Sequence, residues 1–349
     1  MRVLEDNEVV DFVVEVESGR DPIILQLTDI QIIDSAQART PQRISAEEIA
    51  RWATDTMDVN CFHYVREIIE AVKPDLILLT GDNVYGEFDD DGTALLAVVR
   101  FVESFGIPWA PVFGNHDAES KKGVDWQCQQ YENAKHCLFK QRELTGNGNY
   151  AVGIKQDGKL KRVFFMLDTN GARGVSEESL VNGHTLPATA TVGLRKDQII
   201  WYTQQIQRIK ENSPNTKFSV AFHFYPAAFQ KIYEKYGHVS GMEQGPLLID
   251  ELADKEKGDF GCIREEIYPS WDIDYEVWNG WKNLGIDSVF VGHNHINNAS
   301  VIIEGIRCQY GTKSSIYDYH RKDMIGGVVI PLSHEDGTIK SPYTYIVEN

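Results

Sequence analysis

Short apolar runs that end abruptly in a polar residue most constrain how this chain of 349 residues can fold. The run Leu76–Leu79 is bounded by Pro74 and Gly81, and Asp82 follows the glycine directly. Four consecutive aliphatic residues between such breakers are typical of a strand buried on both faces. Functional groups of open α/β sheets lie just beyond the carboxyl ends of these strands. We therefore expect the Asp82 carboxylate to lie at a functional edge of a sheet.

The same pattern recurs along the chain, with amphipathic helices between the strands. Apolar positions at helical spacing predict helices at residues 60–72 and 93–104. Alternation of strands and helices implies a mainly parallel sheet with right-handed crossovers, so the expected fold class is α/β. Four further runs, each with the polar residues that follow it, are Ile23–Leu27 with Asp29 and Gln31, Trp109–Phe113 with Asn115, His116 and Asp117, Lys217–Phe222 with His223, and Ile286–Val291 with His293 and His295.

No stretch has the composition of a domain linker, so we predict one domain, residues 1–349, with two insertions at about 118–148 and 226–275. The first insertion is expected to carry one helix, at about 125–142. The dipeptide Asp157-Gly158 between two β-type runs is typical of a tight hairpin. Further expected elements are an edge strand at 9–17, a short helix from Ser45, hairpin strands at 149–154 and 162–167, a loop at 171–195, a helix at 196–210 and tail strands at 301–303, 308–310, 327–332 and 343–347.

The charge balance limits the partners to be expected. Acidic residues number 52 against 34 basic ones, a net charge of −18, which argues against a nucleic-acid-binding surface and against an anionic membrane surface. No run of eighteen apolar residues predicts a transmembrane helix, and the acidic start of the chain does not resemble a signal peptide. The five cysteines form no Cys-x-x-Cys pair, as is typical of reduced thiols. We expect a cytoplasmic protein, and the oligomeric state is not predicted.

Six oxygen or imidazole donors follow the apolar strands and would converge at one sheet edge. A set of carboxylate, amide and imidazole groups without thiolate suits Mn, Fe or Zn. Six ligands are too many for one tetrahedral ion, so two ions that share a carboxylate are the economical arrangement. Taken singly, Asp29 could cap a helix, Asn115 could form a turn and His223 could be a hydrogen-bonded core residue, but their joint occurrence favours a metal site. The six are Asp29, Asp82, Asn115, His223, His293 and His295.

Together these motifs resemble the calcineurin-like metallophosphoesterase superfamily, over nearly the whole predicted core from residue 29 to residue 295. The stretches 80–85 and 114–120 are most similar to the purple acid phosphatase-related branch, in particular its small single-domain members. The resemblance implies a four-layer αββα sandwich with a dimetal site at the carboxyl edges of the central strands. The motifs are Asp29-Ile-Gln31, Gly81-Asp82-Asn83, Gly114-Asn115-His116-Asp117, His223 and Gly292-His293-Asn294-His295.

The resemblance also implies a role for each matching residue. A hydroxide held by the ions would attack the phosphorus of a small phosphate monoester in line with the leaving oxygen. His116 would donate a proton or hydrogen bond to the leaving group, and Asp117 would orient the His116 ring and raise its pKa. The implied metal ligands are Asp82 as the bridge, Asp29 and His295 for the first ion, and Asn115, His223 and His293 for the second.

One departure from the superfamily pattern concerns the first metal. The first motif is usually Asp-x-His, and Gln31 occupies the histidine position here. Purple acid phosphatases also lack this histidine and use a tyrosinate three residues after the bridging aspartate, which is the offset of Tyr85 from Asp82. A phenolate is a hard anionic donor, so we predict that Tyr85 ligates iron in the first site, with Fe, Mn or Zn in the second. The alternatives are Mn in both sites or Zn, with Tyr85 packed as an ordinary aromatic residue and Gln31 as a weak ligand or a contact to substrate.

Two alternatives to a phosphomonoesterase stay open. A phosphodiesterase acting on small or nucleotide diesters would use the same metal site, and the shape of the two insertions would decide between them. A non-catalytic binding or scaffold protein would keep the sandwich without the chemistry, as some members of the superfamily do. Such a protein has no need of His116 together with Asp82 and all the metal ligands, so the sequence favours an enzyme.

Overall fold

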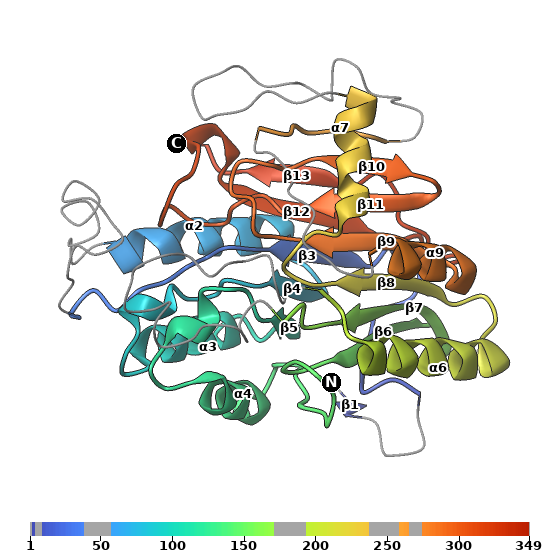
Figure 1. The fold of residues 1–349 in the computed structure, drawn as a ribbon, viewed down its shortest axis with the longest axis horizontal. Helices are drawn as coiled ribbons and strands as arrows, with labels where there is room; N and C mark the ends of the chain where they lie inside the picture. Colours follow the sequence, from blue (N-terminus) through green and yellow to red (C-terminus); the bar gives the residue numbers. More distant parts are fainter. Residues whose placement is uncertain are drawn as a thin grey trace.

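The computed structural model describes residues 2–3, 9–37, 57–170, 193–236, 258–264 and 274–348. The helix expected from Ser45, most of the loop expected at 171–195 and much of the second insertion lie outside these residues. One β-sheet has eight strands, in the order β1-β2-β6-β7-β8-β9-β11-β10, and the other has five, in the order β13-β12-β3-β4-β5. Helices α2, α3 and α4 lie on one flank of the sheets and α6 and α9 on the other (Figure 1). The architecture is the expected α/β sandwich of four layers.

The five-stranded sheet contains the strands predicted at 23–27, 76–79 and 109–113. β3, β4 and β5 run parallel, with Leu25 opposite Ile77 and Leu78 opposite Ala110. β12 pairs antiparallel with both β3 and β13. Because the three parallel strands end at the same edge, the residues that follow them come together there. The strands are β3 Ile23–Leu27, β4 Leu76–Thr80, β5 Trp109–Val112, β12 Gly326–Pro331 and β13 Tyr343–Ile346.

The eight-stranded sheet is mixed. Parallel pairs join β7 to β8, β8 to β9 and β9 to β11, whereas β6 and β7 form the predicted hairpin. Its turn residues Asp157 and Gly158 have φ of 53° and 72°, as a two-residue I′ turn requires. The strand expected at 9–17 is β2, and it is not an edge strand, because β1 pairs with it. The strands are β1 Arg2–Val3, β2 Phe12–Glu15, β6 Tyr150–Gln156, β7 Lys159–Met166, β8 Lys217–Ala221, β9 Ile286–Val291, β10 Ser300–Ile303 and β11 Ile306–Tyr310.

Alternate residues of the strands fill two separate cores. Phe164 and Phe290 pack with the residues of β3 and β4 between the sheets. Phe165 and Val220 belong to the second core, together with Trp201 of α6. Neighbouring residues of one strand point to opposite faces, so both faces of the eight-stranded sheet are covered. The helices are α2 Met57–Val72, α3 Thr93–Glu103, α4 Val124–Asn133, α6 Lys196–Asn212, α7 Gln230–Tyr236 and α9 Asp274–Leu284.

The helix expected at 125–142 is shorter than predicted. It ends with α4, and Ala134 then adopts the extended angles φ −77° and ψ 138°. The following segment runs beside β5: the Trp109 N–H donates to His136 O at 3.1 Å, and the Leu138 N–H donates to Trp109 O at 2.7 Å. The edge of β5 thus receives backbone hydrogen bonds from the second half of the predicted helix. Pairing with a distant strand overrides the local helical pattern here.

The five cysteines are free thiols with buried side chains, in agreement with the reduced state expected from their spacing. Burial raises the pKa of the Cys128 thiol to about 12, so this side chain is a core residue without nucleophilic character. In the described part of the chain, no helix has the length and apolar character needed to cross a membrane.

Candidate metal centre

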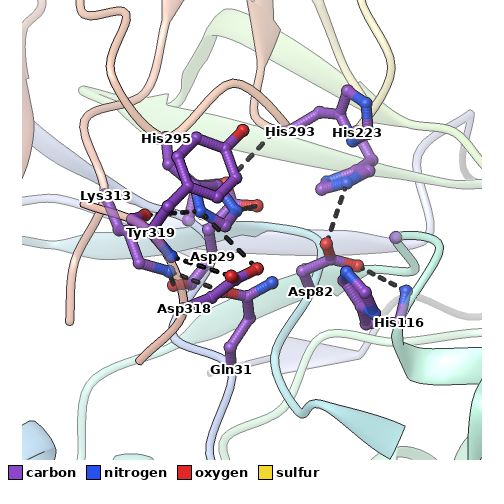
Figure 2. A network of polar contacts seen from close by, with 12 residues as sticks. Asp29, Gln31, Asp82, His116, His223, His293, His295, Lys313, Asp318 and Tyr319 are labelled. Carbon is purple, nitrogen blue, oxygen red and sulfur yellow. Dashed lines mark hydrogen bonds and ion pairs between the residues drawn. The ribbon is translucent and has the colours of Figure 1, made fainter. Parts of the chain in front are cut away.

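The six predicted donors meet where strands of the two sheets end. Figure 2 shows Asp29, Asp82, His223, His293 and His295 around this point. The five-stranded sheet contributes Asp29 after β3, Asp82 after β4 and Asn115 after β5, and the eight-stranded sheet contributes the three histidines after β8 and β9. Convergence at the carboxyl ends of parallel strands is the reason that residues more than 250 positions apart in sequence share one site.

The backbone at this edge adopts conformations that ordinary residues avoid. Asp29, Asp82 and His293 have φ of 53°, 51° and 74°, in the left-handed region that is disfavoured for residues with a side chain. Gly114 is required for close approach, since a Cβ there would lie 2.1 Å from Asp82 Oδ1. Strained backbone that packs this tightly is characteristic of functional sites.

The first ligand group consists of Asp29, Asp82 and His295, whose ligand atoms all lie within 4.8 Å of one another. His295 Nδ1 lies 2.9 Å from the carbonyl oxygen of Tyr319; because a carbonyl only accepts, Nδ1 carries the proton and Nε2 is left to face Asp29 Oδ1 at 3.3 Å. Asp29 Oδ1 is buried without a hydrogen-bond partner among the described residues. An imidazole nitrogen and a bare carboxylate oxygen that face each other fit a metal cation between them.

The second ligand group consists of Asp82, His223 and His293, again within 4.8 Å. His223 Nδ1 lies 2.9 Å from the carbonyl oxygen of Thr80, which directs Nε2 toward Asp82 Oδ2 at 3.3 Å. Asn115 Oδ1 lies 3.2 Å from His223 Nε2 and 3.0 Å from His293 Nδ1. The structure therefore brings the amide oxygen into this group, and Asp82 belongs to both groups, as a bridging carboxylate would.

The charges of the two groups compensate each other. Burial raises the pKa of Asp82, but the nearby His223 and His116 outweigh this effect, and the pKa falls to about 2. Burial lowers the pKa of His223, but the Asp82 carboxylate outweighs burial and raises it to about 9. Burial and the charge of His223 lower the pKa of His293 to about 3. His293 is therefore neutral, the form that binds metals, and metal binding at His223 would displace a proton.

His116 lies beside the bridging carboxylate and is held by Glu119. Its backbone N–H donates to Asp82 Oδ1 at 2.8 Å, and its ring Nδ1 lies 2.8 Å from Glu119 Oε2. Burial lowers the pKa of His116, but Glu119 and Asp82 outweigh burial and raise it to about 10. The sequence prediction missed Glu119. The detectable signal was an acidic residue three positions after the histidine, within the 3₁₀ turn Asp117–Glu119.

Asp117 does not orient the His116 ring, contrary to the prediction. Both of its carboxylate oxygens accept backbone N–H groups of the loops that follow β4 and β5, so the carboxylate joins these loops. Burial and the charge of Asp82 raise the pKa of Asp117 to about 7, while the N–H donors oppose the increase. The donors are the N–H groups of Asp82 at 2.9 Å, Asn83 at 2.9 Å, Val84 at 3.1 Å and Gly114 at 2.7 Å.

Gln31 lies beside the first group, where Lys313 joins it to the backbone oxygen of Asp29, whereas Tyr85 packs against His116. The Tyr85 ring stacks on His116 with centroids 4.1 Å apart, and its predicted role as a metal ligand stays a prediction. Gln31 Oε1, its only metal-competent atom, accepts a hydrogen bond from Lys313 Nζ at 2.5 Å. Burial lowers the pKa of Lys313. The sequence prediction missed this lysine, which no local pattern connects with Gln31.

Two ligand groups that share a carboxylate at the strand ends of an αββα sandwich define a class of protein, the dimetal phosphoesterases. Consistent with this class, the model of the calcineurin-like phosphoesterase family matches residues 23–297. The chain belongs to this family.

Similar proteins include several related to purple acid phosphatases. The chain is 45% identical to Probable inactive purple acid phosphatase 28 of Arabidopsis thaliana over 286 residues, and this matched region covers 76% of this chain and 64% of the relative. It is also 36% identical to Phosphatase DCR2 of Saccharomyces cerevisiae over 246 residues, and this matched region covers 67% of this chain and 38% of the relative. The chain thus spans less than two thirds of the length of these two relatives. A dimetal phosphatase structure from Danio rerio has a TM-score of 0.53 at 12% identity, covers 90% of this chain and 93% of that chain, and shares the fold.

Proposed function

We propose that this chain is a dinuclear-metal phosphoesterase that hydrolyses phosphate monoesters, with His116 assisting the leaving group. The observation that carries the proposal is the position of Asp82 in both ligand groups, with His116 fixed beside it. A binding protein would need neither a shared carboxylate between two cation sites nor a proton donor next to it.

Different residues of the chain have different roles in the proposed reaction. Metal ions bound by the two ligand groups would supply an activated water and neutralise charge on the phosphoryl oxygens. Glu119 engages Nδ1 of the His116 ring, which leaves Nε2 free to give its proton to the leaving oxygen. The carboxylate of Asp117 keeps the loops that carry Asp82 and Asn115 in one arrangement. The proton donor His116 and the metal ligands therefore keep fixed positions relative to one another.

The proposal includes the identity of the metals and of the partners. Iron in the first site, with Fe, Mn or Zn in the second, is supported by the position of Tyr85 three residues after Asp82. An iron-loaded protein should then show a visible charge-transfer band that disappears in Tyr85→Phe. The net charge of −18 supports a small phosphorylated substrate over nucleic acid or an anionic membrane, and five free thiols support a reducing, cytoplasmic location.

A second candidate is a non-catalytic binding protein, and one observation favours it. The name of the Arabidopsis relative described above includes the word inactive. The grouping of the six predicted donors, with His116 beside Asp82, supports an enzyme over this candidate. A third candidate, hydrolysis of phosphate diesters, would use the same groups, so substrate tests must compare monoesters with diesters.

The deciding experiment measures hydrolysis of paired chromogenic monoester and diester substrates by protein supplied with Mn²⁺, Fe²⁺ or Zn²⁺. We expect monoester hydrolysis that falls by roughly 10²- to 10⁴-fold in kcat for His116→Asn, the usual range for a lost general acid. His136→Asn is the matched control. His136 Nδ1 also pairs with a glutamate, Glu103 Oε2 at 3.1 Å, but this pair is not part of the ligand groups, so the variant should keep full activity. Lack of hydrolysis of both substrates with every metal would favour the binding protein.

A further inference from the structure

Gln31 and Lys313 form a buried polar pair beside the first ligand group (Figure 2). Gln31 is 0% exposed and Lys313 is 1% exposed. Lys313 Nζ donates to Gln31 Oε1 at 2.5 Å and to the backbone oxygen of Asp29 at 2.9 Å. Because an ammonium group only donates hydrogen bonds, the amide of Gln31 must present its oxygen to Lys313. The amide nitrogen then faces the opposite way.

The Gln31 amide nitrogen is a buried donor without a hydrogen-bond partner among the described residues. Figure 2 shows it on the side away from Lys313, toward the middle of the labelled side chains, which include Asp29 and Asp82. An N–H₂ group cannot ligate a cation, but it can donate to an anion. Unpaired buried donors are destabilising, so such a group in a preformed site indicates a ligand that accepts from it.

Both residues of the pair are held in place by their backbones. The Gln31 N–H donates to Asp82 O at 2.9 Å, and Gln31 has the left-handed φ of 52°. On the other side, Lys313 forms a parallel bridge with Thr28, and the Gly326 N–H donates to Lys313 O at 3.0 Å. With both backbones fixed, the ammonium sets the direction of the amide.

We propose that Lys313 orients Gln31 so that its side-chain N–H₂ donates a hydrogen bond to an oxygen of the phosphoryl group bound at the dimetal centre. Gln31 is then a substrate-binding residue, and Lys313 is a positioning residue that acts through it. The inference rests on the proposed phosphoesterase function, and it gives position 31 a contact to the anion in place of a metal ligand.

The test measures binding of inorganic phosphate to the Mn²⁺-loaded protein by isothermal titration calorimetry, together with the Mn²⁺ affinity of the metal-free protein. Gln31→Glu keeps the acceptor for Lys313 and replaces the donor with a carboxylate oxygen. We expect this variant to bind phosphate roughly tenfold more weakly or worse, with Mn²⁺ affinity undiminished. Equal phosphate affinity in the variant and the wild type would overturn the inference, and so would a loss of Mn²⁺ binding.

Lys313→Met tests the positioning role. We expect weaker phosphate binding, and the double variant Gln31→Met/Lys313→Met should bind phosphate no more weakly than Gln31→Met alone, because both changes remove the same interaction. Additive effects would contradict a role through Gln31.

Lys161→Met is the matched control for Lys313→Met, since Lys161 is a buried lysine that donates to the backbone oxygens of His334 and Glu335 at 2.7 and 2.8 Å. It should leave phosphate binding unchanged, and an equal loss in this control would overturn the positioning role. If Lys313→Met does not fold, Gln31→Glu still decides whether position 31 donates to phosphate, because it retains the lysine and its acceptor. Wild-type protein that binds neither Mn²⁺ nor phosphate would refute the proposed function itself, whereas normal binding with unaffected variants would refute only the inference.

Discussion

Asp117→Asn is the substitution for which the structure allows the most detailed prediction. The wild-type carboxylate accepts four backbone N–H groups, two on each oxygen. An asparagine at this position keeps one carbonyl oxygen and turns an N–H₂ group toward the other two donors. Two buried backbone N–H groups therefore lose their acceptor while the shape of the side chain hardly changes.

The expected loss of stability follows from these two groups. A buried donor left without a partner costs about 1–3 kcal/mol, so Asp117→Asn should lower the free energy of unfolding by about 2–6 kcal/mol. Urea unfolding of the metal-free protein at pH 8 would measure the loss, because the carboxylate is ionised above its pKa of about 7. Mn²⁺ affinity should also fall, since the loops that carry Asp82 and Asn115 are no longer joined.

The control for this measurement is Asp197→Asn, since the Asp197 carboxylate lies in a part-buried position at the start of α6, where it accepts the backbone N–H of Thr145 at 2.6 Å. Its expected loss is below about 1.5 kcal/mol. A loss for Asp117→Asn no larger than this would refute the reasoning. A shift of the pH–rate profile in Asp117→Asn without loss of stability would instead support the original expectation that Asp117 acts on His116.

Three further changes test other parts of the structure. Glu119→Gln removes the anion that raises the pKa of His116, so the alkaline limb of the pH–rate profile should move to lower pH, and an unchanged profile would argue against the pairing. Arg162→Met removes a fully buried guanidinium that pairs with Asp287 at 2.6 and 2.8 Å. Because the Asp287 carboxylate left behind is 34% exposed and can be solvated, urea unfolding should show a loss of about 1.5–3 kcal/mol, and a loss below about 0.5 kcal/mol would contradict it. Burial raises the pKa of Asp89 to about 6, so its charged form is disfavoured in the folded state. Relative to Asp89→Asn, the wild type should therefore lose about 2 kcal/mol of stability as the pH rises from 4 to 7. If the free energies of unfolding of the two proteins changed equally with pH, this effect would be excluded.

Much of the fold was predictable because its signals are local. Apolar runs bounded by Pro or Gly identified β3, β4 and β9, and the spacing of apolar residues identified α2 and α3. The segment after Ala134 was predicted wrongly, because its backbone pairs with Trp109 of β5, and no pattern within the segment itself reports that partner. The second sheet was predicted only through the family resemblance. Hydrophobic periodicity shows that a face of a strand is buried, but it does not show whether a helix or another sheet packs on that face.

The sequence by itself determined the set of metal donors, because their residue types and their places after successive strands can be read directly. Only the tertiary structure decided what surrounds them. Glu119 rather than Asp117 contacts the His116 ring, because the 3₁₀ turn brings residues three positions apart together. Gln31 meets Lys313, 282 positions further along the chain, because the segment after β11 lies beside the loop after β3. Contacts of this kind depend on how the sheets pack, and they decide whether position 31 faces a metal or an anion.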